Sequence, residues 1–205
     1  MYRGKILNLK NDIKGEQVLI RLDTKDAAIK RQQSITLYLD DDKEITGQQR
    51  KKIYATLRDI ALYTGYLPDE IKQIMKYEHI SRTGCKLFSL ADCSMDTARE
   101  FINTLIDFCL QYGVPVQDTM LSRTDDVGTY LHQCLKHRKC CICGRPGEIH
   151  HWDAIGMGKD RRTYDDSQNR KMCLCRTHHT IAHQKGVVDF QNSYHVYGII
   201  YNEVK

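Results

Sequence analysis

The 205-residue sequence has no long hydrophobic run, since no apolar stretch approaches the roughly 20 residues that a membrane-spanning helix needs. It also lacks an apolar segment behind its first residues, so this end does not look like a secretory signal peptide. The compositional biases of collagen, coiled coils and disordered chains are missing too, because 41% of the residues are hydrophobic and 28% are charged. We therefore expect a globular, cytoplasmic protein that has no membrane partner.

The nine cysteines indicate metal binding more than disulfide bonding, because thiols stay reduced in the cytoplasm and nine cannot all pair. Six of them fall between Cys134 and Cys175, and six of the nine histidines fall between His137 and His183. Charge is uneven as well: residues 1–131 hold 19 basic and 19 acidic residues, whereas residues 132–205 hold 12 and 7. The whole net charge of +5 thus lies in the region rich in cysteine and histidine.

A break in the pattern supports two domains, 1–131 and 132–205. Gly113, Pro115 and the polar stretch 117–126 come before a short predicted helix, Val127–Lys139. In the first domain, alternating apolar residues predict strands at 2–9, 16–22 and 34–39. The pair Thr46 and Gln49 predicts a capping box at the start of a helix that Gly65 ends.

Two more helices are predicted in this domain. One begins at Leu67-Pro68-Asp69 and carries Ile71, Ile74 and Met75, and the other runs from Ser94 to Gly113. The first domain is therefore predicted to be a small α+β domain, with a small sheet plus helices.

A basic run, Arg50-Lys51-Lys52, opens the first predicted helix near Tyr54, Tyr63 and Tyr66. Basic residues with nearby aromatic rings suit single-stranded nucleic acid, through phosphate neutralisation and base stacking. From these residues alone, a solvated helix face with half-buried tyrosines is the favoured interpretation.

A resemblance adds to that interpretation. Residues 40–116 resemble the phage recombination-mediator family typified by the lambda Orf (NinB) protein, in the segments Ile45–Lys52, Leu57–Ile60, Phe88–Leu90, Ser94-Met95 and Glu100-Phe101. The resemblance implies single-stranded DNA binding, association with single-strand-binding protein and a homodimer.

In the second domain, Cys140-x-x-Cys143 and Cys175-x-x-His178 have the spacing of two zinc knuckles. Together they form a closed set of three cysteines and one histidine that is typical of structural Zn2+. A 74-residue domain is marginally stable without such a metal, so the zinc has a folding role. Cys141 and Cys173 stay open as alternative ligands.

Four more histidines lie beside these knuckles. His179 and His183 are four residues apart, so a helix presents them on one face, and His150 or His151 can complete a three-ligand metal site. The remaining histidine suits a general base that activates water. A zinc finger that only binds DNA explains the four knuckle residues but not these histidines.

The two segments resemble the HNH endonucleases, most of all those of phages of Gram-positive bacteria, and Ala154–Arg162 resembles that group's loop of glycines and basic residues. The resemblance implies a ββα-metal fold and DNA cleavage that leaves a 5′-phosphate and a 3′-hydroxyl. It implies His151 as general base, Asn169 as the motif asparagine, and His150, His179 and His183 as ligands of the catalytic metal. The reverse assignment of His150 and His151 stays open, because neighbours in a strand point to opposite faces.

Three imidazoles favour Zn2+, Ni2+ or Mn2+ over Mg2+, which remains an option where water and substrate oxygens fill the shell. Candidate phosphate contacts are the basic residues Lys159, Arg161, Arg162, Arg170, Lys171 and Arg176, with a solvated surface charge as the alternative for each. After Gly186 we predict a terminal pair of strands with a turn at Asn192-Ser193. The predicted function is a metal-dependent DNA endonuclease of a phage recombination system, and the alternative is a non-catalytic mediator.

Overall fold

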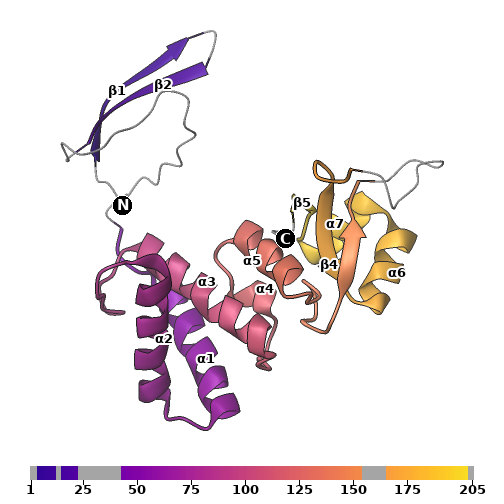
Figure 1. Cartoon of the computed structure of the whole chain (residues 1–205), viewed down its shortest axis with the longest axis horizontal. Helices are drawn as coiled ribbons and strands as arrows, with labels where there is room; N and C mark the ends of the chain where they lie inside the picture. Colours follow the sequence, from indigo (N-terminus) through magenta and orange to yellow (C-terminus); the bar gives the residue numbers. More distant parts are fainter. Residues whose placement is uncertain (1–3, 13–14, 23–42, 154–164, 203–205) are drawn as a thin grey trace. The chain divides into compact units, whose positions relative to one another are not determined.

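The computed structural model describes residues 4–12, 15–22, 43–153 and 165–202, and the chain divides into two compact units, 1–39 and 40–205 (Figure 1). In the first unit, β1 (Gly4–Asp12) pairs antiparallel with β2 (Gly15–Leu22), with a register shift between Ile6 and Asn8. The first two predicted strands are thus confirmed as a pair. The strand predicted at 34–39 lies outside the described residues.

The second unit opens with α1 (Gly47–Thr64), whose predicted ends are both confirmed. The Thr46 side chain accepts the N–H of Gln49, and the Gln49 side chain accepts the N–H of Thr46 in return, which completes the capping box. At the other end, Gly65 adopts the left-handed conformation with φ of 80°. The helix buries an apolar stripe that includes Ile53 and Leu57.

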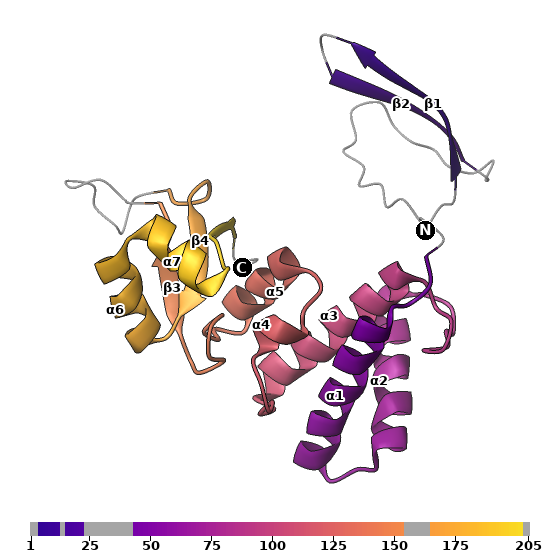
Figure 2. The same ribbon diagram turned by 180° about the vertical axis from the view of Figure 1, so that it is seen from behind.

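Two further helices, α2 (Pro68–Thr83) and α3 (Met95–Tyr112), pack with α1 around one core (Figure 2). The core side of α3 is an apolar stripe, with Phe101 and Leu105 fully buried. In α2, Ile71 and Met75 are buried, whereas Ile74 is 46% exposed. No helix within the described ranges is both long and apolar enough to span a membrane.

A short helix, α4 (Met120–Arg123), leads into α5 (Val127–Lys136), which ends three residues before the predicted Lys139. The α5 helix packs against α3 and also against the later strand β4 (Arg170–Leu174). The predicted boundary after Leu131 falls inside this helix, and Leu131 is fully buried. The division at residue 131 stays a prediction, with α5 as the element shared by both parts.

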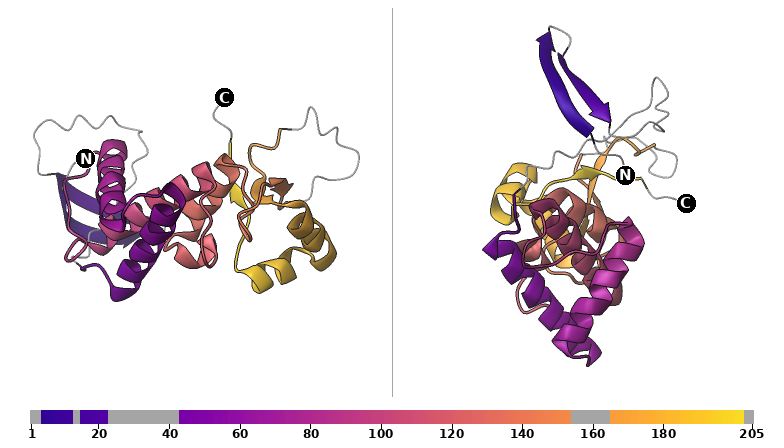
Figure 3. Two further views of the ribbon diagram at one scale, coloured as in Figure 1. Left: turned by 90° about the horizontal axis from the view of Figure 1, so that it is seen from below. Right: turned by 90° about the vertical axis from the view of Figure 1, so that its left-hand side faces the viewer.

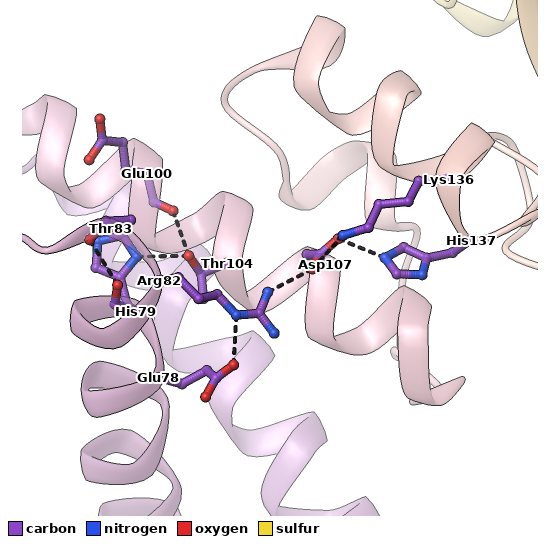
Figure 4. Close-up of polar contacts among 9 residues, drawn as sticks. All are labelled: Glu78, His79, Arg82, Thr83, Glu100, Thr104, Asp107, Lys136 and His137. Carbon is purple, nitrogen blue, oxygen red and sulfur yellow. Dashed lines mark hydrogen bonds and ion pairs between the residues drawn. The ribbon is translucent and has the colours of Figure 1, made fainter. Parts of the chain in front are cut away.

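A polar network centred on Asp107 joins α2, α3 and the end of α5 (Figure 4). The Asp107 carboxylate accepts hydrogen bonds from Arg82 at 2.7 Å, Lys136 at 3.1 Å and His137 at 2.7 Å. Burial acts to raise the pKa of Asp107, but these hydrogen bonds outweigh it and lower that pKa below its ordinary value. The network therefore fixes the chain at the point where the cysteine-rich segment begins.

The cysteine- and histidine-rich segment contains a three-stranded antiparallel sheet in the order β3 (Glu148–His151), β4 (Arg170–Leu174) and β5 (Ile199–Ile200). After β4 come α6 (Arg176–Lys185) and α7 (Val187–Tyr194), which lie side by side (Figure 3). Met172 and Leu174 of β4 are both fully buried. The described chain is therefore a mixture of helices and small sheets, as the predicted α+β class requires.

The predicted terminal strand pair was wrong for residues 187–194, which form α7. Short apolar runs do not distinguish strand from helix, because Val187, Phe190 and Tyr194 also repeat at helical spacing. Phe190 is buried, and its ring lies 4.7 Å from that of Tyr194, one turn later. Among the described residues after Gly186, only Ile199–Ile200 forms a strand, and it pairs with β4.

Candidate functional site

The first knuckle is a tight turn that brings Cys140 and Cys143 together. The Gly144 N–H donates to the Cys140 carbonyl at 2.8 Å, and the Cys140 N–H donates to the Arg145 carbonyl at 2.7 Å. Gly144 has φ of 69°, a left-handed conformation that favours glycine. The second pair comes from α6, where Cys175 is the N-cap residue and His178 lies in the first turn.

The four predicted knuckle ligands form one cluster, with their ligand atoms within 4.8 Å of one another. The sulfurs of Cys143 and Cys175 are 3.7 Å apart, and His178 Nδ1 lies 3.4 Å from Cys140 Sγ and 3.3 Å from Cys175 Sγ. Around a tetrahedral zinc, two sulfurs lie about 3.8 Å apart, and a sulfur and a nitrogen about 3.5 Å apart. The cluster is therefore compatible with zinc.

Arg145, which the sequence reasoning missed, adds positive charge beside two of these sulfurs. Its guanidinium lies 3.3 Å from Cys143 Sγ and 3.7 Å from Cys175 Sγ. Burial acts to raise the pKa of Cys143, but hydrogen bonds, that of Arg145 foremost, outweigh burial and lower it. This favours the thiolate form, which is the form that binds metal.

The alternative ligands Cys141 and Cys173 lie in the core beside the cluster. Both are fully buried, and the Cys141 N–H donates to the Cys173 carbonyl at 3.0 Å. Neither belongs to a group of metal-ligating side chains among the described residues. Burial raises the pKa of Cys173 to about 12, which keeps this thiol protonated.

A second cluster joins β3 to α6. His150, His179 and His183 place their ligand atoms within 4.8 Å of one another, and their ring centroids are separated by 4.7 to 5.0 Å. His150 is 7% exposed. Burial, and then the neighbouring His179 and His183, lower its pKa to about 4, so its imidazole is neutral near pH 7 and able to bind a metal. The donor set thus fits a divalent metal.

His151, although adjacent to His150, faces a different partner. Its Nε2 lies 2.7 Å from Asp166 Oδ2, while His150 faces the two α6 histidines. Alternation along β3 accounts for the difference, because successive side chains point to opposite faces. The structure therefore groups His150, and not His151, with His179 and His183.

Asn169 lies in the turn that leads into β4. Its backbone N–H donates to the Asp166 carbonyl at 3.0 Å, and the residue is half-buried. Asn169 therefore belongs to the same short segment as the carboxylate that contacts His151.

The predicted phosphate contacts differ in accessibility. Arg176 is exposed at the start of α6, and Arg170 is exposed but paired with Asp153 at 2.6 Å. Lys171 is 5% exposed, and its ammonium pairs with Asp166. Its contact with phosphate stays a prediction. The glycine-basic loop at 154–162 lies outside the described residues. It includes the predicted phosphate contacts Lys159, Arg161 and Arg162.

The three basic residues at the start of α1 also differ in accessibility and in their partners. Arg50 donates to the Ala91 carbonyl at 2.8 Å, and Lys52 pairs with Asp125, while Lys51 is exposed. Two of the three predicted contacts thus also stabilise the fold. 

Asp166 was missed by sequence reasoning. It follows His151 by fifteen residues with no motif spacing to mark it. The pairing of β3 with β4 brings the segment that carries it back beside His151.

Comparison with known families gives a match over most of the chain. Residues 12–204 match the family model described as Putative HNHc nuclease, and the chain belongs to this family. The match includes residues of both predicted domains. No curated protein and no solved structure matches the chain.

Proposed function

We propose, since the chain is a member of the HNHc nuclease family, that it is a metal-dependent DNA endonuclease. The observation that carries the proposal is the meeting of His150 from β3 with His179 and His183 from α6. Three ligands leave coordination positions open for water and substrate, which is typical of a catalytic metal site. His151, the proposed general base, directly follows the ligand His150 in the chain.

His150, His179 and His183 would hold the divalent metal. The metal, when bound, would supply a Lewis acid that stabilises negative charge on the phosphate and on the leaving 3′ oxygen. The neutral imidazole of His150 supports this role. Nitrogen ligands favour Zn2+, Ni2+ or Mn2+, with Mg2+ as the further option.

His151 would act as the base. Its imidazole takes a proton from water, and an electron pair of the water oxygen forms the new bond to phosphorus. The bond from phosphorus to the 3′ oxygen breaks, and its electron pair leaves on that oxygen, which takes up a proton from solvent. The products carry a 5′-phosphate and a 3′-hydroxyl.

Cys140, Cys143, Cys175 and His178 would hold a structural zinc. Cys175 and His178 lie in the first turn of the helix that carries His179 and His183. A zinc at this cluster would therefore fix the start of α6 relative to the knuckle. It would keep the catalytic histidines in register with His150.

DNA would bind through the basic residues of the second domain, for which the exposed Arg176 and the net charge of +5 in residues 132–205 give support. Lys159, Arg161 and Arg162 remain candidates, and so does the exposed Lys51 of α1. Asn169 would help to hold the segment that faces the base.

The N-terminal part would serve as a single-stranded or branched DNA-binding module in phage recombination. The resemblance to the Orf family supports this role, along with single-strand-binding protein and a second copy of the chain as partners. A reducing cytoplasm would suit the free thiols. The alternative function is a recombination mediator whose zinc finger only binds DNA, and the histidine cluster argues against it.

A cleavage panel tests the proposal. Purified protein is incubated with single-stranded, duplex and branched DNA and with each divalent metal, and His151→Ala is assayed alongside. We expect metal-dependent cleavage that falls by about 10² to 10⁴-fold in the variant, the contribution of a positioned general base. DNA binding should be unchanged.

The matched control is His132→Ala, which removes an exposed histidine of α5. Cleavage retained in His151→Ala would refute the base assignment. Absence of cleavage by the wild-type protein with every metal and DNA structure would favour the mediator function.

A further inference from the structure

The contact between His151 and Asp166 is part of a larger arrangement. His151 and Lys171 are directly opposite each other in the register of β3 and β4. One carboxylate joins them, since Asp166 Oδ2 lies 2.7 Å from His151 Nε2 and Asp166 Oδ1 lies 2.8 Å from Lys171 Nζ. Both carboxylate oxygens are therefore engaged.

Lys171 fixes the position of this carboxylate. Its side chain is almost fully buried, and its ammonium also donates to the Tyr201 carbonyl at 3.2 Å. A buried ammonium needs a paired charge, because an isolated charge in the protein interior is strongly destabilising. Asp166 supplies that charge, so Lys171 holds the carboxylate at the end of β3.

The backbone around Asp166 is held as well. The Asp166 carbonyl accepts the N–H of Asn169, and the Trp152 N–H, one residue after His151, donates to the Arg170 carbonyl at 2.8 Å. The segment that carries Asp166 is thus tied to the same pair of strands as His151. Its contact with the imidazole follows from the sheet and not from a chance side-chain rotamer.

We propose that Asp166 is the positioning residue of His151, accepting the proton on Nε2 and leaving the lone pair on Nδ1 to take the proton from water. This inference rests on the proposed function, in which His151 is the base. A neutral imidazole carries one N–H and one lone pair, and an ionised carboxylate only accepts hydrogen bonds. The carboxylate therefore selects the tautomer.

The charge of Asp166 would also serve the step itself. When Nδ1 takes the proton, the ring becomes an imidazolium, and a carboxylate on the other nitrogen stabilises it, as in serine hydrolase triads. Hydrogen bonds from Lys171 and then from His151 lower the pKa of Asp166, so the group is ionised near pH 7. 

The test compares Asp166→Asn with the wild-type full-length protein. The asparagine amide N–H donates to Nε2, which moves the imidazole proton to Nδ1 and removes the lone pair that the water needs. We expect kcat to fall by about 10²-fold, the lower end of a general base's contribution, while KM for DNA and the metal content stay unchanged. A purely structural role would not give this separation of kcat from KM.

The matched control is Asp165→Asn, at an exposed neighbour whose carboxylate accepts the Ser167 N–H at 3.0 Å. It should cleave like the wild type. A second measurement needs no variant: the nitrogen NMR spectrum of 15N-histidine-labelled wild-type protein reports which nitrogen of His151 carries the proton. We expect the proton on Nε2.

The outcomes separate this inference from the proposed function. Wild-type kcat in Asp166→Asn, together with loss of cleavage in His151→Ala, would overturn the positioning role and leave the base assignment standing. A His151 proton on Nδ1 in the wild type would overturn it too, even if Asp166→Asn fails to fold. Retained cleavage in His151→Ala would instead refute the base assignment on which this inference rests. Absence of cleavage by the wild-type protein with every metal and DNA structure would overturn the proposed function.

Discussion

The two clusters of metal-ligating side chains differ in ligand number and type although both use α6. One contains three cysteines and a histidine with the spacing of a closed tetrahedral site, and the other contains three histidines. His178 and His179 are neighbours in the chain but belong to different clusters, because successive residues of a helix point about 100° apart. One helix thus serves a structural and a catalytic site in our proposal.

In our proposal, one small segment holds a site for stability and a separate site for catalysis. Four protein ligands leave no position for substrate, so the cysteine-containing cluster can contribute stability only. Three ligands leave positions open, and the neighbouring His151 faces Asp166 instead of the cluster.

The largest effect is expected from Cys175→Ser, which removes a ligand of the proposed structural zinc. Structural zinc contributes about 10 to 16 kcal/mol in zinc-finger peptides, so losing one thiolate should unfold the segment after α5. Zinc content by mass spectrometry and amide hydrogen exchange would measure this. Exchange should rise in β3, β4 and α6 and stay slow in α1 and α3.

The control for that variant is Cys85→Ser, at a half-buried cysteine outside both clusters. Its zinc content and exchange should equal those of the wild type. Slow exchange of β4 in zinc-free Cys175→Ser would show that the sheet folds without the metal, and would break the contrast between the clusters.

A smaller effect is expected from acid on protein that carries one equivalent of zinc and no catalytic metal. The pKa of His150 is about 4 when folded and near 6.5 when unfolded, so the unfolded chain binds the proton more tightly. The stability contributed by neutral His150 is present above pH 6.5 and is lost as the pH falls toward 4, by about 3 kcal/mol. Urea unfolding at several pH values would measure this loss.

His150→Gln sharpens the same measurement. This variant has no imidazole to protonate, so its unfolding free energy should fall less steeply between pH 6.5 and 4 than that of the wild type. If the unfolding free energy falls equally steeply with pH in the two proteins, protonation of His150 does not contribute to the loss of stability in acid.

Much of the fold was accessible to sequence reasoning where a local pattern determines the structure. The capping box of Thr46 and Gln49 and the left-handed Gly65 were predicted because both depend on neighbouring residues only. Spacing predicted the pairing of CxxC with CxxH and of the i, i+4 histidines. The choice of His150 over His151 rested on the resemblance to HNH nucleases.

The errors came where distant parts of the chain decide the outcome. The burial of Lys171 was not predicted, because it depends on the pairing of β4 with β3 and on Asp166. Asp166 was missed for the same reason. Residues 187–194 form a helix in which Phe190 is buried, and the few apolar residues of this segment do not reveal that burial from the sequence.

The most direct test of the central claim is the metal content and cleavage activity of His183→Ala. The substitution lies at an exposed position of α6 and leaves the cysteine-containing cluster untouched. We predict that native mass spectrometry finds two bound metals in the wild type but only one zinc in the variant, and that the variant keeps its fold and no longer cleaves DNA. Cleavage at the wild-type rate by His183→Ala would contradict the account.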